Sequence, residues 1–409
     1  MNLKRCLLVT APAGSLVLGV VACSDGRVLG VVEPDAALAA PPAADPSEDD
    51  VPSTEDAGSS DDASADSDAA VAGPSCTHEG WCHTVVPGGQ TLKSVWGDGH
   101  GVVWAVSEEG NVLRWDGAAW VQSHAAGVPL HAIWGSGPTD LWAGGGVTSK
   151  NNVAMPGVLL HGTGSSPSSI SWTHVSAPVT IRSIWGTSAN DVYAAASVTN
   201  RVDATDPSFV LHYSESEWTI DSVSTAFPAH FERVWGTSRD DIWVAGRVPV
   251  SPYFVNGQVL HRRPDGAGGF TWTKELSSMT GSTTVDVFGF SASSNATFLI
   301  GFTSDYNGPY YHTGTSNDEG ASFTWTPYRG ALTGFTQNAL STLWATGPDD
   351  VWLAGQQGRL RHWNGTEWHV AAVALDKWPV QNAVHAIWGS GSNDIWVVGA
   401  DIALHKVAP

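Results

Sequence analysis

Short runs of apolar and β-branched residues recur along the chain, and most of them lead into a Trp-Gly pair. Residues 133–142 read IWGSGPTDLW, and residues 387–396 repeat this phrase as IWGSGSNDIW. The other five copies begin at Trp96, Trp185, Trp235, Phe288 and Trp344. The apolar residues before each anchor predict an inner strand, and those after it predict a second strand. The Gly-x-x-x-x-Asp segment between them predicts a tight turn, whose carboxylate we expect to accept backbone N–H bonds.

Two further strands follow in each copy. The third strand is marked by a recurring histidine, at His161, His212, His261, His362 and His405. The fourth strand carries its own tryptophan, at Trp120, Trp172, Trp218, Trp272, Trp325 and Trp368. Four short strands per unit, with aromatic and glycine landmarks, are typical of a propeller blade. Because the histidines repeat at one position of separate blades, we interpret them as packing or hydrogen-bonding residues and not as ligands of one metal ion.

The seven copies predict an all-β fold, a seven-bladed β-propeller with four-stranded blades. The last copy stops at His405, after its third strand, and lacks the tryptophan of a fourth strand. Residues 80–85 supply a matching segment, since Trp81 precedes Trp96 by the usual spacing. We therefore expect the N-terminal strand around Trp81 to complete the last blade and close the ring, which pairs edges that would otherwise be free.

One turn carries a recognisable motif. Residues 316–323 read SNDEGASF and match the Asp-box pattern Ser-x-Asp-x-Gly-x-Ser/Thr-aromatic. With the Trp-Gly repeats, the region from Trp81 to the C-terminus resembles the Asp-box-like (BNR/sialidase-type) propellers of bacterial surface lipoproteins. In sialidase-like families the Asp-box is a structural turn on the face opposite the active site. The resemblance thus implies a blade marker and no catalytic role for this turn.

The N-terminal region predicts export. Residues 1–22 combine Lys4 and Arg5 with an apolar run too short to span a bilayer, and read as a signal peptide. The run ends in VVAC, which resembles a lipobox and implies lipidation of Cys23 and attachment to the membrane. Ser24, the next residue, implies the outer membrane, with its periplasmic and surface faces both open. An ordinary signal peptide cut near Ala22 is the alternative.

Residues 23–75 predict a disordered acidic tether of Ala, Asp, Ser and Pro, and residues 76–409 the propeller. The formal net charge of −21 falls in large part on the tether. With no basic patch, such a chain is not expected to bind nucleic acid. Cys76 and Cys82 lie six positions apart in an oxidising compartment, which favours a disulfide. A metal site with His78 and His83 is the alternative, although the spacing fits no familiar zinc pattern.

Two sets of residues are candidates for ligand binding. Three positions before each anchor the chain carries a mostly polar residue, at Lys93, His131, Arg182, Glu232, Val285, Ser341 and His385. We hypothesise that these side chains ring the mouth of the central channel; the alternative is that they cap the strand starts and meet only water. The variable loops on the same face add Arg201, Asp203, Tyr253, Tyr306 and Trp378.

The sequence contains no phosphate-binding loop, nucleophile elbow or metal-binding motif, and it implies no cofactor. We therefore expect a non-enzymatic module that binds a glycan or an envelope or extracellular protein. A sialidase-like glycoside hydrolase that uses the loop-rich face is one alternative, and a purely structural surface protein is another. Two carboxylates about 5–9 Å apart in the channel mouth would favour the hydrolase.

Overall fold

The computed structural model describes residues 76–408, apart from residues 148, 151–152, 199–205, 252–253, 278–285, 293–295, 303–308, 319, 330–339, 348, 372 and 374–379. The predicted signal peptide, lipidation site and tether lie outside this part of the chain. No helix within the described part is both long and apolar enough to cross a membrane.

The described backbone forms seven four-stranded sheets, each of which we name after its innermost strand. The first four, in chain order, are the β2 blade, with β2 (Leu92–Gly97), β3 (Val103–Ser107), β4 (Asn111–Trp115) and β5 (Trp120–Ala125); the β6 blade, with β6 (Leu130–Gly137), β7 (Asp140–Gly145), β10 (Gly157–Ser166) and β11 (Ser169–Ala177); the β12 blade, with β12 (Ile181–Ser188), β13 (Asp191–Ser197), β14 (Ser208–Ser214) and β15 (Glu217–Ile220); and the β16 blade, with β16 (His230–Ser238), β17 (Asp241–Ser251), β18 (Phe254–Pro264) and β19 (Phe270–Ser277).

The remaining sheets follow the same order of strands. They are the β20 blade, with β20 (Asp286–Ala292), β21 (Ala296–Phe302), β22 (Pro309–Thr315) and β23 (Thr324–Arg329); the β24 blade, with β24 (Leu340–Gly347), β25 (Asp350–Gly355), β26 (Leu360–Trp363) and β27 (Trp368–Val370); and the β28 blade, with β28 (Val384–Gly391), β29 (Asp394–Gly399), β30 (Ile402–Lys406) and β1 (Trp81–His83). Short additions are a two-stranded sheet of β8 (Ser149–Lys150) and β9 (Val153–Ala154), a helix α1 (Val223–Ala226) and a 3-10 turn η1 (Gln356–Gly358).

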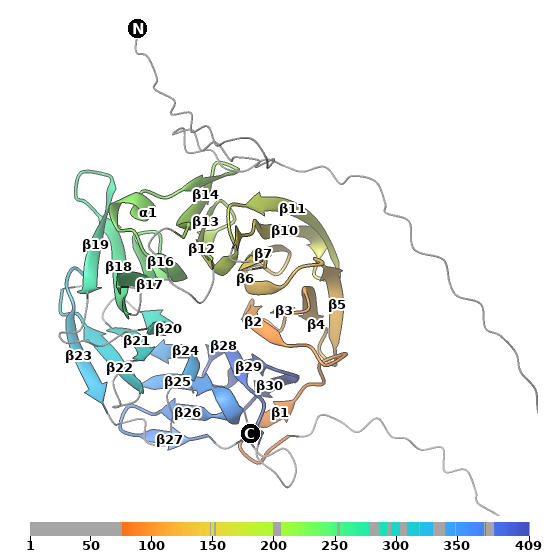
Figure 1. The fold of residues 1–409 in the computed structure, drawn as a ribbon. Helices are drawn as coiled ribbons and strands as arrows, with labels where there is room; N and C mark the ends of the chain where they lie inside the picture. Colours follow the sequence, from red (N-terminus) through yellow and green to blue (C-terminus); the bar gives the residue numbers. More distant parts are fainter. Residues whose placement is uncertain are drawn as a thin grey trace, which may run out of the picture.

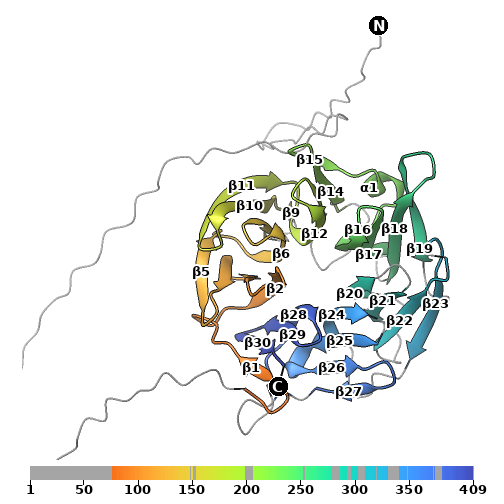
Figure 2. The ribbon, with the colours of Figure 1, turned by 180° about the vertical axis from the view of Figure 1, so that it is seen from behind.

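The innermost strands contact one another in a closed ring around a central axis, with β28 returning to β2. Figures 1 and 2 show this ring from its two faces, with the fourth strands at the rim. Apolar clusters fill the space between neighbouring sheets, as the wedge shape of a propeller requires. The fold is a β-propeller.

The predicted closure by the N-terminal strand is confirmed. Strand β1 pairs with β30, with Trp81 opposite Lys406 and His83 opposite Leu404. The Trp81 side chain is 2% exposed and meets the ring of Trp352 edge-on at a centroid distance of 5.5 Å. The indole thus fills the space between the last two blades that a fourth-strand tryptophan fills elsewhere.

The predicted sevenfold repeat of anchors is wrong, because six blades carry the anchor tryptophan and the β20 blade does not. In the β2 blade the register shifts between Leu92 and Ser94. In the β20 blade the corresponding shift lies between Val287 and Gly289, so Phe288 does not occupy the anchor position.

The register places Ser291 and Ala292 of the β20 blade at the positions of Trp and Gly, since Ser291 pairs with Phe298 as Trp96 pairs with Trp104. Phe288, the predicted anchor, therefore lies three residues before the anchor position of this blade. The anchor tryptophan is present in six blades, at Trp96, Trp134, Trp185, Trp235, Trp344 and Trp388.

The glycine of the anchor is explained by the tryptophan of the preceding blade. A Cβ on Gly236 would lie 2.6 Å from the Trp185 ring, and a Cβ on Gly97 would lie 2.5 Å from the Trp388 ring. Gly135, Gly186 and Gly389 meet their neighbours in the same way. Among the six blades with the anchor tryptophan, the β24 blade alone has alanine, Ala345, in place of the glycine. The blade before it is the β20 blade, where serine replaces the tryptophan.

The recurring histidines belong to a repeated hydrogen-bond network. In the β16 blade, His261 Nε2 lies 2.6 Å from Asp241 Oδ1, and the imidazole stacks on Trp243 at a centroid distance of 3.8 Å. Thr237 donates its hydroxyl to the other carboxylate oxygen of Asp241. The remaining His–Asp pairs, at 2.7–2.8 Å, are His161–Asp140, His212–Asp191, His362–Asp350 and His405–Asp394.

This network corrects the expected role of the turn aspartate. In these pairs the carboxylate accepts hydrogen bonds from imidazole, hydroxyl and, at Asp241 and Asp350, indole groups of side chains. Burial opposes ionisation of Asp241, but the hydrogen bonds from His261 and Thr237 outweigh it and lower the pKa of the carboxyl. The predicted structural role of the histidines, packing or a shared hydrogen bond, is confirmed.

The Asp-box segment closes the turn between β22 and β23. Asp318 Oδ1 accepts hydrogen bonds from the Ser316 hydroxyl at 2.7 Å and from the backbone N–H of Ser322 at 2.8 Å. Hydrogen bonds from Ser322 and Ser316 lower the pKa of Asp318 to about 2. Arg263 from the preceding blade donates to the carbonyl of Gly320, so this turn also links two blades.

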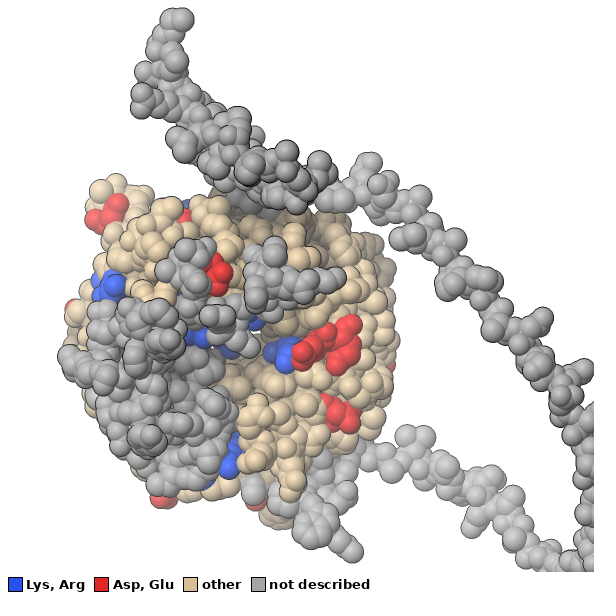
Figure 3. Space-filling model, viewed as in Figure 1, with Lys and Arg blue, Asp and Glu red and all other residues tan. Residues whose placement is uncertain are grey.

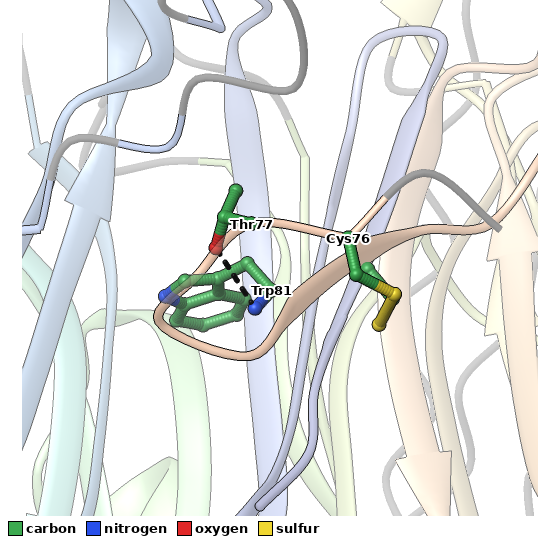
Figure 4. The surroundings of a disulfide bond; sticks show 4 residues. Cys76, Thr77 and Trp81 are labelled. Atoms are coloured by element: carbon green, nitrogen blue, oxygen red, sulfur yellow. Dashed lines mark hydrogen bonds between the residues drawn. A yellow bond between two sulfur atoms is a disulfide. The ribbon is translucent and has the colours of Figure 1, made fainter. Parts of the chain in front are cut away.

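Cys76 and Cys82 are joined by a disulfide, so their thiols are not available as metal ligands. Figure 4 shows the bridge beside the hydrogen bond from the Trp81 backbone N–H to the Thr77 hydroxyl, which is 3.2 Å long. The bridge closes a short loop at the start of the strand that completes the ring.

Candidate binding site at the mouth of the central channel

The inner strands enclose a cavity of about 430 Å³ on the axis of the ring. Figure 3 shows Lys and Arg atoms bordering the hollow at its centre, with a patch of Asp and Glu beside them. Its described lining comes from the β2, β6, β12, β16, β24 and β28 strands, and each strand contributes a polar or small residue, an aliphatic residue and the anchor tryptophan. The volume is within the range of small-ligand pockets.

A β-bulge near the start of the inner strands shapes the polar end of this cavity. In β12 the register shifts between Ile181 and Ser183, so Arg182 has no partner in the ladder. Arg182 and Ser183 consequently both line the cavity, although they are neighbours in sequence. The next blade repeats the shift between Phe231 and Arg233, and Arg233 lines the cavity.

The charged side chains at this end form two ion pairs. Lys93 Nζ lies 2.8 Å from Glu108 Oε2, and Arg247 Nη2 lies 2.6 Å from Glu232 Oε1. Arg182 and Arg233 line the cavity as well, and the Glu232 charge also acts on Arg182. The described lining therefore carries three cationic side chains, Lys93, Arg182 and Arg233, and no carboxylate.

Arg182 has a buried donor that the described residues leave unused. Its Nε donates to the carbonyl of Ser197 at 3.3 Å, whereas its buried Nη2 has no hydrogen-bond partner among the described atoms. Burial lowers the pKa of Arg182, and the positive charges of Arg233 and Arg247 act in the same direction. Since a guanidinium stays protonated at neutral pH, it retains an unused N–H donor beside the cavity.

Two histidines near the mouth, His131 and His385, have lowered pKa values. Burial lowers the pKa of His131 to about 4, and the charge of Arg182 contributes to the shift. Burial also lowers the pKa of His385 to about 4, together with the charge of Lys93. Both imidazoles are therefore neutral at pH 7. His131 Nε2 lies 3.2 Å from the carbonyl of Gly146, which positions its ring.

The structure brings together four of the predicted residues around the cavity, namely Lys93, His131, Arg182 and His385. Glu232 does not line it and is held by Arg247, while Ser341 donates to the carbonyl of Val384 in the next blade. Val285 and the loop candidates Arg201, Asp203, Tyr253, Tyr306 and Trp378 lie outside the described residues. The binding role of all these residues stays a prediction.

Sequence reasoning missed Arg233, Ser94 and Ser183. The Ser183 hydroxyl lies 3.3 Å from both the backbone N and the carbonyl O of Val234, and Ser94 accepts from Ile133 N–H at 3.3 Å. These bonds tie adjacent inner strands together. In the sequence, each of these residues is a second polar residue directly after the bulged one. In a regular strand, successive side chains point to opposite faces, so this second residue was expected to face away from the cavity.

The described lining of the cavity contains no Asp or Glu. The nearby Glu108 is bound to Lys93, and that hydrogen bond lowers the pKa of its carboxyl despite partial burial. Glu232 is bound to Arg247. The described residues thus give the glycoside hydrolase alternative no free pair of carboxylates facing the cavity.

No protein-family model matches this chain, and no curated protein matches its sequence. Solved structures do resemble it. The structure described as "YCF48 bound to D1 peptide" superposes with a TM-score of 0.55 at 14% sequence identity, over 82% of this chain and 99% of that chain. YCF48 from Cyanidioschyzon merolae gives the same TM-score and identity over 80% and 99%. The WD40 β-propeller domain of Doa1 gives a TM-score of 0.51 at 11% identity over 79% and 95%. At these identities the likeness shows the fold alone: the chain shares the β-propeller fold with these proteins.

Proposed function

We propose that this protein is a non-enzymatic binding module that binds an acidic segment of a partner protein at the mouth of its central channel. The observation that carries the proposal is the buried Arg182 guanidinium, which has an unused donor beside a cavity of about 430 Å³ whose described lining contains no carboxylate. A carboxylate is the group that best matches a guanidinium in charge and geometry.

A protein partner is favoured over a glycan by the charge of the site. Neutral sugars are bound through hydroxyl partners and gain little from the charge of the Arg182 guanidinium, whereas Asp, Glu or a C-terminal carboxylate gains a charge-assisted hydrogen bond. One of the similar propellers was solved with a peptide bound to it. That likeness supports a propeller of this shape as a peptide-binding scaffold, and the partner class is our inference from the cavity.

Display on the cell envelope through lipidated Cys23 is part of the proposal, because a tether of some fifty residues would hold the open channel away from the membrane. Cys23→Ala should move the protein from the membrane fraction to the soluble fraction. Unchanged fractionation would refute the anchor and leave the channel site untouched.

The channel site can be tested by selecting peptides from a random display library on the full-length chain. We expect enrichment of acidic peptides that bind Arg182→Gln at least about tenfold more weakly, because the substitution removes the charge of a buried ion pair. Lys274→Gln is the matched control, since Lys274 is an exposed cation on the outer strand β19.

Equal binding to wild type and Arg182→Gln, with unchanged thermal denaturation of the variant, would refute the channel site. Specific binding on a glycan array together with no enriched peptide would replace the protein partner with a carbohydrate.

A further inference from the structure

Two histidines on the outer edge of the ring face each other across neighbouring blades. His124 lies on β5 of the β2 blade, and His174 lies on β11 of the β6 blade. Their Nε2 atoms are 3.3 Å apart. His124 is half-buried and His174 is exposed, so solvent and dissolved ions reach the pair.

We propose that His124 and His174 together bind one divalent transition-metal ion of the Zn²⁺, Ni²⁺ or Cu²⁺ class and thereby clip the outer strands of two blades. Neutral imidazole nitrogens are preferred ligands of these ions. Two Zn–N bonds of about 2.0–2.1 Å that meet at a tetrahedral angle place their nitrogens about 3.3 Å apart. The pair already has this separation.

The surroundings hold the first ligand in place. The Trp172 ring stacks on His124 at a centroid distance of 5.8 Å and an interplanar angle of 26°. Its Nε1 donates to the hydroxyl of Ser123, the residue before His124, at 3.4 Å.

The two rings, inclined at 63° with centroids 5.5 Å apart, point at each other more directly than two ligands of one ion do. Binding therefore requires a small rotation of each ring, and the exposed side chain of His174 leaves room for it. Within the described ranges, no group of three or more His, Cys, Asp or Glu residues is arranged around a common point. Water would complete the coordination, as at an open site.

This site is separate from the central channel, and its test does not depend on the proposed function. The experiment is isothermal titration of the full-length chain, purified without a histidine tag, with Ni²⁺ and with Zn²⁺. The baseline is the double variant His124→Ala/His174→Ala, which removes the pair and keeps the other 13 histidines of the chain.

We expect one saturable site per chain in the wild type and its loss in His124→Ala, His174→Ala and the double variant. His174→Gln should lose it as well, because an amide can keep a hydrogen bond to His124 but is a poor ligand for these ions. His100→Ala is the matched control: it removes a histidine from the turn between β2 and β3 and should retain the site. Bound metal should also raise the Tm of the wild type and not of the double variant.

A wild-type titration that equals the double variant would overturn the proposal, and so would retained binding in His174→Gln. Loss of the site in His100→Ala would place the metal elsewhere. The melting curves without metal show whether a variant has lost binding only because it has lost its fold.

Discussion

Five of the six anchor tryptophans pack on the glycine of the next blade, and this contact predicts a sharp difference between two substitutions in one strand. In β28, a Cβ on Gly389 would lie 2.7 Å from the carbonyl oxygen of Asp394 and 2.7 Å from Cη2 of Trp344. A Cβ on Gly391, two residues along the same strand, would have no atom within 4 Å. Gly389→Ala should therefore destabilise the ring, and Gly391→Ala should not.

The magnitude follows from the contacts. Both Gly389 distances are below those that real Cβ atoms show, and the carbonyl belongs to the paired backbone of β29, so the sheet itself must shift. Overpacking of this kind costs about 1–3 kcal/mol. Alanine also restricts the unfolded chain relative to glycine, but this effect is shared by both variants and cancels in their difference. For a folded body of about 330 residues, 1–3 kcal/mol corresponds to a Tm decrease of about 1.5–4 °C.

Scanning calorimetry of the wild type and both variants measures this difference. Gly391→Ala should stay within about 0.5 kcal/mol of the wild type. Equal Tm values for the two variants would refute the idea that the glycine is required by the neighbouring blade.

Two further predictions concern histidines. His261→Ala should lower the free energy of unfolding by about 2–4 kcal/mol, because it removes a fully buried ring and leaves the Asp241 carboxylate without its imidazole partner. The control His369→Ala, at an exposed position, should change it by less than about 0.5 kcal/mol. Urea unfolding would measure both variants, and equal effects would contradict the hydrogen-bond network. The pKa of His131 and of His385 is about 4 in the folded state, below the value of about 6.5 in the unfolded chain. Between these two pH values the unfolded chain therefore binds protons that the folded protein does not. The stability that the two neutral histidines contribute is complete above about pH 6.5 and is lost as the pH falls towards 4. The Tm of the wild type should consequently fall more steeply over this interval than that of His131→Gln/His385→Gln, and parallel curves would argue against buried neutral imidazoles.

The sequence predicted the architecture well because propeller strands are marked by local features. Trp81 was assigned to the last blade from its spacing alone, and the pairing of β1 with β30 bears this out. The histidines were also interpretable, because each repeats together with an aspartate one strand earlier. Where the aspartate is missing, as in the β2 blade, Arg114 stands opposite Trp104 at the place of the histidine.

The β20 blade and the polar end of the channel were harder to predict for one physical reason. A β-bulge inserts an extra residue into a strand, and the alternation of hydrophobic and polar residues does not reveal it. Every residue after the bulge therefore lies on the opposite face of the sheet from the one that alternation predicts. This displaced the anchor from Ser291 to Phe288. It also hid Arg233, which lines the cavity although Glu232 had been expected to do so. The His124–His174 contact joins two blades, and no local pattern encodes such a pairing.

The closure of the ring has a consequence for the order in which the molecule assembles. The Thr84 hydroxyl bonds to the carbonyl of Ala403, 319 residues away, so β1 has no partner during most of synthesis. The early blades can fold as hairpins while the chain emerges, but Trp81 stays without its packing site until β30 is available. A chain that stalls before β30 is complete would present the unpaired edges of β1 and β29 to chaperones and proteases, so the integrity of the whole ring depends on its last few residues.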